Sequence, residues 1–258
     1  MTALLQLTDV SRSFGGLQAL SHVDLAAPEG KIIGLIGPNG AGKTTLINNI
    51  SGLDHPNAGS ISLAGQDITH APAHVVTRLG IARTYQNIRL FGEMTVLENL
   101  LIGQHTRGSA GILGALVYSP GYRREEQRLR ETAYALLDRF GLTRFAGLRA
   151  DTLPYGDQRR LELARALSMQ PRLLLLDEPT AGMNPNETHG LGDQILRLQD
   201  EGLTVLVIEH DMSLIHQVCD EIYVLSFGQI IAHDTPDAIR QNRQVIEAYL
   251  GEDDDGAA

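Results

Sequence analysis

The stretch GPNGAGKTT, residues 37–45, decides the fold of this 258-residue chain. It fits the pattern G-x-x-x-x-G-K-[S/T], follows the apolar run KIIGLI (31–36) and opens the helix-forming run TTLINNISGL (44–53). Glycines let backbone N–H groups curl around phosphate oxygens without an obstructing Cβ, and a helix N-terminus adds favourable potential for an anion. The stretch therefore predicts a phosphate-binding loop between a strand and a helix.

The residue types inside this loop suit a nucleotide with its metal. Lys43 is predicted to reach the β- and γ-phosphates, and the Thr44 hydroxyl is predicted to ligate Mg²⁺. The alternative is a plain glycine turn, which the flanking strand and helix make less favourable. The nucleotide-binding residues predicted here are Gly37, Pro38, Asn39, Gly40, Ala41, Gly42, Lys43, Thr44 and Thr45.

The run RLLLLDEP (172–179) predicts the second half of a nucleotide site. Four leucines before Asp177 describe a buried strand whose carboxyl end presents an acid, where ligands of open α/β sheets collect. Asp177 suits a Mg²⁺ contact, and Glu178 can orient or deprotonate an attacking water. By itself, an Asp-Glu pair after an apolar run is usually no more than the polar end of a strand. Together with the phosphate loop, it indicates chemistry on a nucleotide.

Two further polar residues occupy comparable positions. LTVLVIEHDM (203–212) delivers His210 at the end of another apolar run, which favours a contact with the γ-phosphate or the water over a structural role. Gln86 lies in ARTYQN (82–87), where strand-like sequence gives way to helical sequence, and it is a candidate ligand of the metal or its water.

The flanking patterns predict an α/β protein. Short apolar runs alternate with helical runs before residue 86 and again after Pro171, which indicates a mainly parallel sheet covered on both faces. The segment between has helical spacing and predicts an insertion. We therefore expect a core of residues 1–86 and 170–250, a helical subdomain of about 87–169, one last helix near 236–250, and a disordered acidic tail of 251–258.

Composition narrows the functional classes. The formal net charge of −10 argues against general nucleic-acid binding, which needs clustered cations. The single cysteine, Cys219, excludes a disulfide within the chain and is expected to be a small core residue. The N-terminal MTALLQLTDV lacks the features of a secretory signal, and the weakly polar stretch 109–119 is too short to span a bilayer.

Over nearly its whole length, the chain resembles the ATP-binding cassette (ABC) ATPases. GPNGAGKTT, Gln86, LPYGDQRRLELARAL (153–167), LLLLDEP and IEHD occur in the order of that family. The resemblance implies a P-loop core with N-terminal antiparallel strands and an inserted helical subdomain. It also implies a head-to-tail pair of cassettes that sandwiches two ATP molecules. Each ATP then lies between one chain's phosphate loop and the other chain's signature segment, here Pro154, Tyr155, Gly156 and Asp157.

The resemblance implies further roles. Phe14, in SRSFGGLQAL, matches the aromatic residue that stacks on adenine, although as a bare sequence feature it could equally be core. Gln86 matches the residue that couples the metal to the helical subdomain, which docks on membrane subunits. AGMNP (181–185) matches a loop that usually carries an aspartate across the dimer interface. This chain has Asn184 there, which puts an ionic role in doubt.

The signature segment also departs from the family pattern Leu-Ser-Gly-Gly-Gln. Pro154 replaces the serine and offers neither a hydroxyl nor an amide N–H to a phosphate. Because this weakened contact belongs to the partner's ATP, a homodimer would suffer it twice. We expect a second, different cassette as the partner, with a homodimer as the alternative.

Within the family, the chain most resembles LivG-type cassettes of bacterial branched-chain amino-acid importers. This resemblance rests on residues 82–105, 155–167, 177–188, 207–212 and 228–252. It implies two membrane permease subunits, a periplasmic or extracellular solute-binding protein acting indirectly, no nucleic acid, and a peripheral position on the cytoplasmic face of the inner or plasma membrane. The alternatives are a soluble cassette in DNA repair or translation, and a small-molecule kinase with a phosphate loop.

Overall fold

The structure, a computed structural model, describes residues 3–104, 120–210 and 212–255. Its contacts divide the chain into two compact units. Unit 1 comprises residues 1–83 and 172–258, and unit 2 comprises residues 84–171. The sequence pattern alone put the corresponding divisions at 86/87 and 169/170.

Unit 1 is built on a six-stranded sheet with the order β10-β9-β3-β8-β7-β6. Its members are β3 (Ile32–Ile36), β6 (Ile81–Arg83), β7 (Leu173–Asp177), β8 (Thr204–Ile208), β9 (Glu221–Ser226) and β10 (Gln229–Asp234). All neighbouring pairs are parallel except β9 with β10. Every residue of β3, β7 and β8 is buried, as continuous apolar strands in a doubly covered sheet should be. The prediction of a mainly parallel sheet is confirmed.

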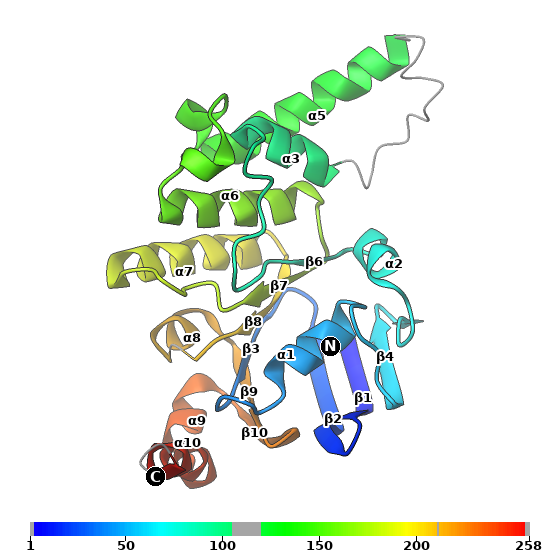
Figure 1. Cartoon of the computed structure of the whole chain (residues 1–258), viewed down its shortest axis with the longest axis vertical. Coiled ribbons are helices and arrows are strands. Elements are labelled where there is room, and N and C mark those ends of the chain that lie inside the picture. The colour runs from blue at the N-terminus through cyan, green and yellow to red at the C-terminus, as the bar shows by residue number, and fades with distance from the viewer. Residues whose placement is uncertain (1–2, 105–119, 211, 256–258) are drawn as a thin grey trace. The chain divides into compact units, whose positions relative to one another are not determined.

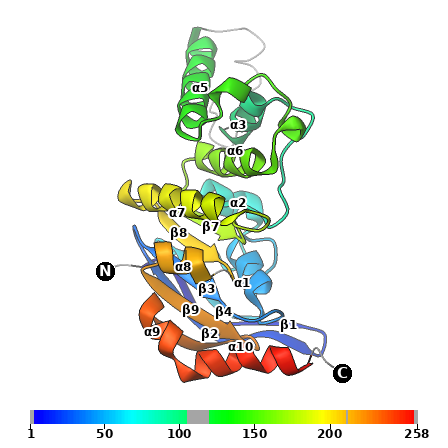
Figure 2. The same cartoon turned by 90° about the vertical axis from the view of Figure 1, so that its left-hand side faces the viewer.

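Helices cover both faces of this sheet. Figures 1 and 2 show α1 (Lys43–Ile50) on one face, and α7 (Pro185–Asp200) and α8 (Met212–Val218) on the other. On the α8 face, an added Cβ at Gly34 would lie 3.4 Å from Cδ1 of Ile215 in α8 and 3.1 Å from the Sγ of Cys219 just after that helix, so the helix packs closely on β3. Cys219 is a buried free thiol, which confirms its prediction as a core residue, and burial raises its pKa.

A second sheet in unit 1 is antiparallel, with the order β2-β1-β4-β5. Its strands are β1 (Ala3–Phe14), β2 (Leu17–Pro28), β4 (Ala58–Leu63) and β5 (Gln66–Asp67), followed by helix α2 (Ala73–Arg78). Its apolar face shares one core with α1 and with the large sheet. The β1–β2 hairpin places Phe14 at its tip, paired with Leu17.

Unit 2 is helical. It contains α3 (Val96–Gln104), α5 (Pro120–Arg139), α6 (Tyr155–Ser168) and two short 3₁₀ turns, η2 (Thr143–Phe145) and η3 (Ala150–Thr152). Leu100, Leu137 and Leu161, one from each helix, are fully buried. The weakly polar stretch 109–119 lies outside the described residues. In the part of the chain that the structure describes, no helix is both long and apolar enough to cross a membrane.

The C-terminal region corrects two expectations. The single helix predicted near 236–250 is two helices, α9 (Pro236–Gln241) and α10 (Arg243–Asp255), because Asn242 has an extended ψ of 116° and its side chain accepts a hydrogen bond from Gln244 N at 2.9 Å. The tail was expected to be disordered, yet α10 continues to Asp255. Extending an existing helix needs no new nucleus. Residues 256–258 lie outside the described residues.

Candidate active site

The phosphate loop has the backbone conformation that its glycines predict. Gly37 has a φ of 151° and Gly42 a φ of 105°, both costly for a residue with a side chain. A Cβ on Gly37 would overlap the carbonyl oxygen of Leu225, and one on Gly42 would lie 2.5 Å from the carbonyl oxygen of Ala19. The loop is therefore wedged between β9 and β2, and only glycine fits at these two points.

Helix α1 begins directly after the loop, with Gly42 as its N-cap and no acidic residue in its first turn. The first N–H groups of a helix have no acceptor within it, so they are donors for an anion. The Lys43 ammonium lies back on the loop and donates to the carbonyl oxygens of Gly37 and Pro38, the latter at 2.8 Å. Reaching a phosphate requires Lys43 to leave these two carbonyls.

A cavity of about 380 Å³ opens over the loop. It joins residues that are far apart in sequence, from the β1–β2 hairpin, the loop, the end of β7 and the β9–β10 turn. It is lined by Phe14, Leu17, Gln18, Ala19, residues 39–45, Glu178, Phe227 and Gly228. The structure thus brings together Phe14, most of the predicted loop residues and Glu178, in a space large enough for a small-molecule ligand.

Phe14 is half-exposed at the edge of this cavity. The guanidinium carbon of Arg12 lies 4.5 Å from the centroid of its ring, and Arg12 is itself held by Asp54 through two hydrogen bonds of 2.6 and 2.9 Å. A cation over one face of an aromatic ring orients the ring and covers that face. Phe14 is therefore a fixed aromatic surface of the cavity and not a core residue.

Asp177 ends β7 and is buried. Its Oδ2 accepts a hydrogen bond of 2.8 Å from Nη2 of Arg83, at the end of neighbouring β6. Arg83 also donates to Asn48 Oδ1 on α1 at 2.7 Å. The carboxylate is thus oriented by a charged group that the sequence did not single out, because the pair is separated by 94 positions.

Glu178 follows with a left-handed backbone, φ 45°. Its N–H donates to the carbonyl of Ile208 at 2.9 Å, which ties it to the end of β8. Nδ1 of His210 lies 3.8 Å from its Oε2. A non-glycine residue in this region costs about 1–3 kcal/mol, and such strain concentrates at functional sites. The structure therefore brings the two predicted catalytic side chains, Glu178 and His210, together.

Beneath them lies a glutamate that the sequence analysis missed. Glu209 is fully buried, and its Oε1 accepts hydrogen bonds from Thr180 N at 2.9 Å and Thr180 Oγ1 at 2.6 Å. Its Oε2 accepts one from His210 N at 3.1 Å. The sequence signal for this role was a charged residue placed directly after the apolar run of a strand. Glu209 joins the loop after Glu178 to the loop that carries His210.

Glu209→Ala is expected to destabilise unit 1 by about 2–4 kcal/mol, because it leaves buried donors of Thr180 and His210 without their acceptor. Glu209→Gln keeps an acceptor oxygen and is expected to lose less. Urea unfolding of the two variants and the wild-type chain measures the difference. Equal stability of all three would contradict a structural role for this carboxylate.

Asn184 has a local structural role. It is the N-cap of α7, and its Oδ1 accepts hydrogen bonds from Asn186 N at 3.0 Å and Glu187 N at 3.1 Å. Glu187 Oε2 accepts from Asn184 N in return, at 3.0 Å, which completes a capping box. The asparagine at this position therefore starts a helix, whatever it contacts in a partner.

Asn184→Ala is expected to lower the free energy of unfolding by about 0.5–2 kcal/mol, as for other lost N-caps. Asn184→Asp, the matched control, retains an acceptor oxygen and places a negative charge at a helix N-terminus, so its stability should equal or exceed that of the wild-type chain. Thermal unfolding of the three proteins provides the comparison. An alanine variant as stable as the aspartate variant would argue against the cap.

The signature segment lies in unit 2 and opens α6 as predicted. Pro154 is the N-cap, and Tyr155 and Gly156 are the first helical residues. Pro154 and Tyr155 are exposed, whereas Asp157 is buried and paired with Arg160. The exposed helix start supplies backbone donors, while the Asp157 carboxylate is buried beside Arg160.

Helix α6 also holds the segment that contains Gln86, through hydrogen bonds to the backbone of that segment. The guanidinium of Arg159 donates to the carbonyl of Tyr85 at 2.6 Å and to that of Gln86. Glu162 pairs with Arg159 at 3.1 Å and accepts from Arg89 N at 3.1 Å. Burial raises the pKa of Glu162, and the Arg89 N–H and the Arg159 charge partly oppose this. Gln86 itself lies in an exposed bend of unit 2, and its metal contact stays a prediction.

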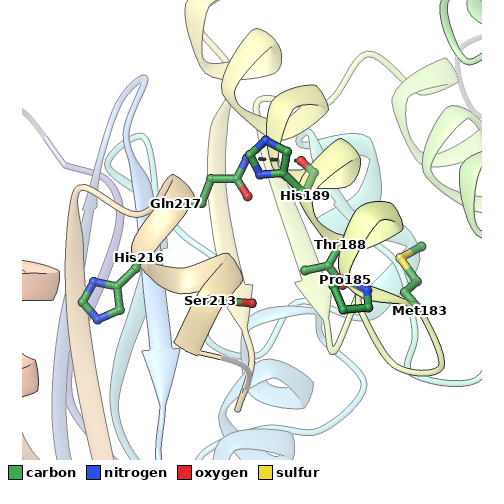
Figure 3. A pocket seen from close by; sticks show the side chains of 7 residues that line it. All are labelled: Met183, Pro185, Thr188, His189, Ser213, His216 and Gln217. Carbon is green, nitrogen blue, oxygen red and sulfur yellow. Dashed lines mark hydrogen bonds between the residues drawn. The ribbon is translucent and has the colours of Figure 1, made fainter.

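A second cavity in unit 1, of about 570 Å³, lies between α7 and α8. Figure 3 shows the side chains that line it, with Gln217 donating to the backbone carbonyl of His189 at 3.1 Å. None of its lining residues is among the predicted site residues; they are Met183, Pro185, Thr188, His189, Ser213, His216 and Gln217.

Comparison with known families gives two matches. The pattern of the "ABC transporter" family matches residues 20–181. That of the "branched-chain amino acid ATP-binding cassette transporter" family matches residues 229–255, which include β10, α9 and α10. The two matches are separate, with residues 182–228 between them, and together they cover most of the chain.

Curated relatives match almost end to end. The chain is 46% identical to the high-affinity branched-chain amino acid transport ATP-binding protein BraF of Pseudomonas aeruginosa, over 96% of this chain and 98% of BraF. It is 45% identical to LivG of Escherichia coli K12, with the same coverage.

Solved structures share the fold. The ADP conformation of MJ1267, an ATP-binding cassette of an ABC transporter, superposes with a TM-score of 0.85 at 33% identity, covering 97% of this chain and all of that one. The dimeric post-hydrolysis state of MJ0796, bound to ADP and Pi, gives 0.76 at 26% identity, covering 90% and 98%.

Proposed function

The chain belongs to the ABC transporter family as an ATP-binding and ATP-hydrolysing subunit, and we propose that it powers import of branched-chain or related amino acids. Near end-to-end similarity to BraF and LivG carries this proposal. The match of residues 229–255 to the branched-chain family supports it independently of the catalytic motifs, which all cassettes share. The comparisons favour this function over a role in DNA repair or translation.

The cavity over the phosphate loop is the proposed ATP site. The amides at the start of α1 bind the phosphates, and Phe14 stacks on the adenine with the face that Arg12 leaves uncovered. Lys43 exchanges the carbonyls of Gly37 and Pro38 for the β- and γ-phosphates. Two observations support these assignments. The loop has a conformation that only glycine allows at Gly37 and Gly42, and one cavity is lined by Phe14, the loop and Glu178.

The residues present fit a Mg²⁺ ion. The Thr44 hydroxyl is exposed at the start of α1, and the Asp177 carboxylate is held in one orientation by Arg83. Oxygen donors of this kind, completed by phosphate oxygens and water, suit a hard divalent cation. When bound, the ion would neutralise charge on the β- and γ-phosphates. Gln86 is the proposed further ligand, directly or through water.

In the proposed hydrolysis, Glu178 takes a proton from the water that attacks the γ-phosphorus, and the bond to the β–γ bridging oxygen breaks to give ADP and phosphate. Nδ1 of His210 lies 3.8 Å from Oε2 of Glu178, beyond hydrogen-bond distance, and its proposed role is a contact with the attacking water or the γ-phosphate. The buried Glu209 fixes the backbone of His210 and so acts as a positioning residue.

ATP is proposed to close two cassettes by adding γ-phosphate contacts that exist only in the closed pair. The start of α6, at Pro154, Tyr155, Gly156 and the backbone of Asp157, contacts the partner's ATP. A ligand shifts an equilibrium only through unequal affinity for the two states, so hydrolysis reopens the pair. The dimeric cassette among the similar structures supports this arrangement.

The proposed partner cassette is a different chain. Pro154 removes a hydroxyl and an N–H from the site opposite the partner's ATP, and a lost hydrogen bond to a charged group costs about 1.5–3 kcal/mol. The remaining assembly comprises two permease subunits and, indirectly, a periplasmic or extracellular solute-binding protein. The chain would lie at the cytoplasmic face of the inner or plasma membrane, held by the permeases.

The test is reconstitution in proteoliposomes with two permeases, a candidate second cassette and the solute-binding protein. Uptake of radiolabelled leucine, isoleucine or valine should require ATP and both cassettes. Uptake with this chain alone as the cassette would support a homodimer. Failure to bind any permease, together with recovery on nucleic acid or ribosomes, would contradict the transport function.

A further inference from the structure

Phe227 is the most exposed large apolar side chain in the described part of the chain, at 92%. It sits in the two-residue turn between β9 and β10, whose flanking residues Ser226 and Gln229 are paired. Single exposed apolar residues are common and need no special account. The backbone of this turn, however, makes phenylalanine an unfavourable choice.

Both turn residues have left-handed backbones, with φ 44° at Phe227 and 77° at Gly228. A two-residue hairpin turn of this kind favours Asn-Gly or Asp-Gly, because asparagine and aspartate tolerate positive φ. Phenylalanine does not tolerate a positive φ in this way. A bulky residue that is both strained and exposed therefore points to a contact made by its ring.

The turn is fixed against the phosphate loop. Gly228 N donates to the carbonyl of Ala41 at 2.9 Å, and Ser21 N donates to the carbonyl of Gly228 at 2.8 Å. A Cβ on Gly228 would lie 2.7 Å from the carbonyl oxygen of Ala19. Because the loop, β2 and the turn are joined in this way, Phe227 is held at one position beside the nucleotide cavity.

Phe227 is one of the residues that line the same cavity as Phe14 and the loop. Residues 39–45 are the phosphate end of this cavity, so its aromatic lining is where a base belongs. Phe14 offers the base only one face, since Arg12 lies over the ring. We propose that Phe227 is a second aromatic contact for the base of the bound nucleotide, supplied by the β9–β10 turn. This inference rests on the proposed ATP function of the cavity.

Its test uses the isolated full chain and two probes, Mg-ATP and inorganic tripolyphosphate, by titration calorimetry. Phe227→Asn removes the ring and suits the left-handed turn, whereas Phe227→Tyr keeps a ring. We expect Phe227→Asn to weaken ATP binding about 2- to 12-fold, the range for loss of one aromatic stacking contact. It should leave the tripolyphosphate affinity unchanged, and Phe227→Tyr should match the wild-type chain for both probes.

Phe91→Ala is the matched control, since Phe91 is an exposed phenylalanine of unit 2 and should leave ATP affinity unchanged. Wild-type ATP affinity in Phe227→Asn would overturn the inference, and so would equal weakening for ATP and tripolyphosphate, which would indicate a disturbed loop. If the wild-type chain bound neither probe, the proposed function itself would fail, and the inference with it. Loss of transport with unchanged ATP affinity would assign Phe227 to a partner contact instead.

Discussion

Glu178→Gln is expected to lower the rate of ATP hydrolysis by about 10²- to 10⁴-fold, the range for loss of a general base. The amide keeps the size of the side chain but cannot accept the proton of the attacking water. ATP binding should persist, because the phosphates are held by the loop and by α1. Phosphate release under saturating ATP, with ATP affinity measured in parallel, separates the two quantities.

The same variant is expected to accumulate as an ATP-bound dimer when the partner cassette is present, since closure precedes hydrolysis. Size-exclusion chromatography with light scattering detects that species. Glu247→Gln is the matched control: Glu247 pairs with Arg243 on the exposed surface of α10 and should change neither rate nor assembly. Unchanged turnover in Glu178→Gln would remove this residue from the mechanism.

Lys43→Ala is expected to reduce turnover by about 10²- to 10³-fold, the typical effect of removing one preorganised charge-stabilising donor. It should also weaken ATP binding, in contrast to Glu178→Gln, because Lys43 contacts the phosphates in the ground state. Stopped-flow or calorimetric titration with ATP measures the binding loss, and a phosphate assay measures the rate.

Lys31→Ala is its natural control. Lys31 is paired with Asp220 at 2.7 Å and lies outside the residues that line the cavity, so its loss should affect stability and leave ATP affinity unchanged. If Lys43→Ala bound ATP with wild-type affinity, the prediction that the ammonium leaves the carbonyls of Gly37 and Pro38 for the phosphates would be wrong.

Local sequence was sufficient for much of the fold. Buried strands such as β3, β7 and β8 are continuous apolar runs, and the start of α6 near Tyr155 follows directly after Pro154. The pattern did not show the break at Asn242, because both sides of it have helical spacing and a single capping side chain decides between one helix and two.

The residues of the site also fall into two groups, those that the sequence revealed and those that it did not. The phosphate loop, Asp177, Glu178 and His210 could be found from sequence because each stands in a short pattern with its own chemistry. Arg83 and Glu209 could not be assigned a role from sequence. Their partners, Asp177 and Thr180, are brought to them by neighbouring strands and loops of the sheet.

What the sequence by itself determined about this protein is therefore its class of fold, its family and the location of its phosphate chemistry, all of which follow from periodicity and short motifs. Only the tertiary structure decided the pairing of Asp177 with Arg83, the burial of Asp157 and the place of Phe227 on the nucleotide cavity. The physical reason is that these features depend on strand register and on backbone angles at single residues, which join distant segments and leave no periodic trace in the chain.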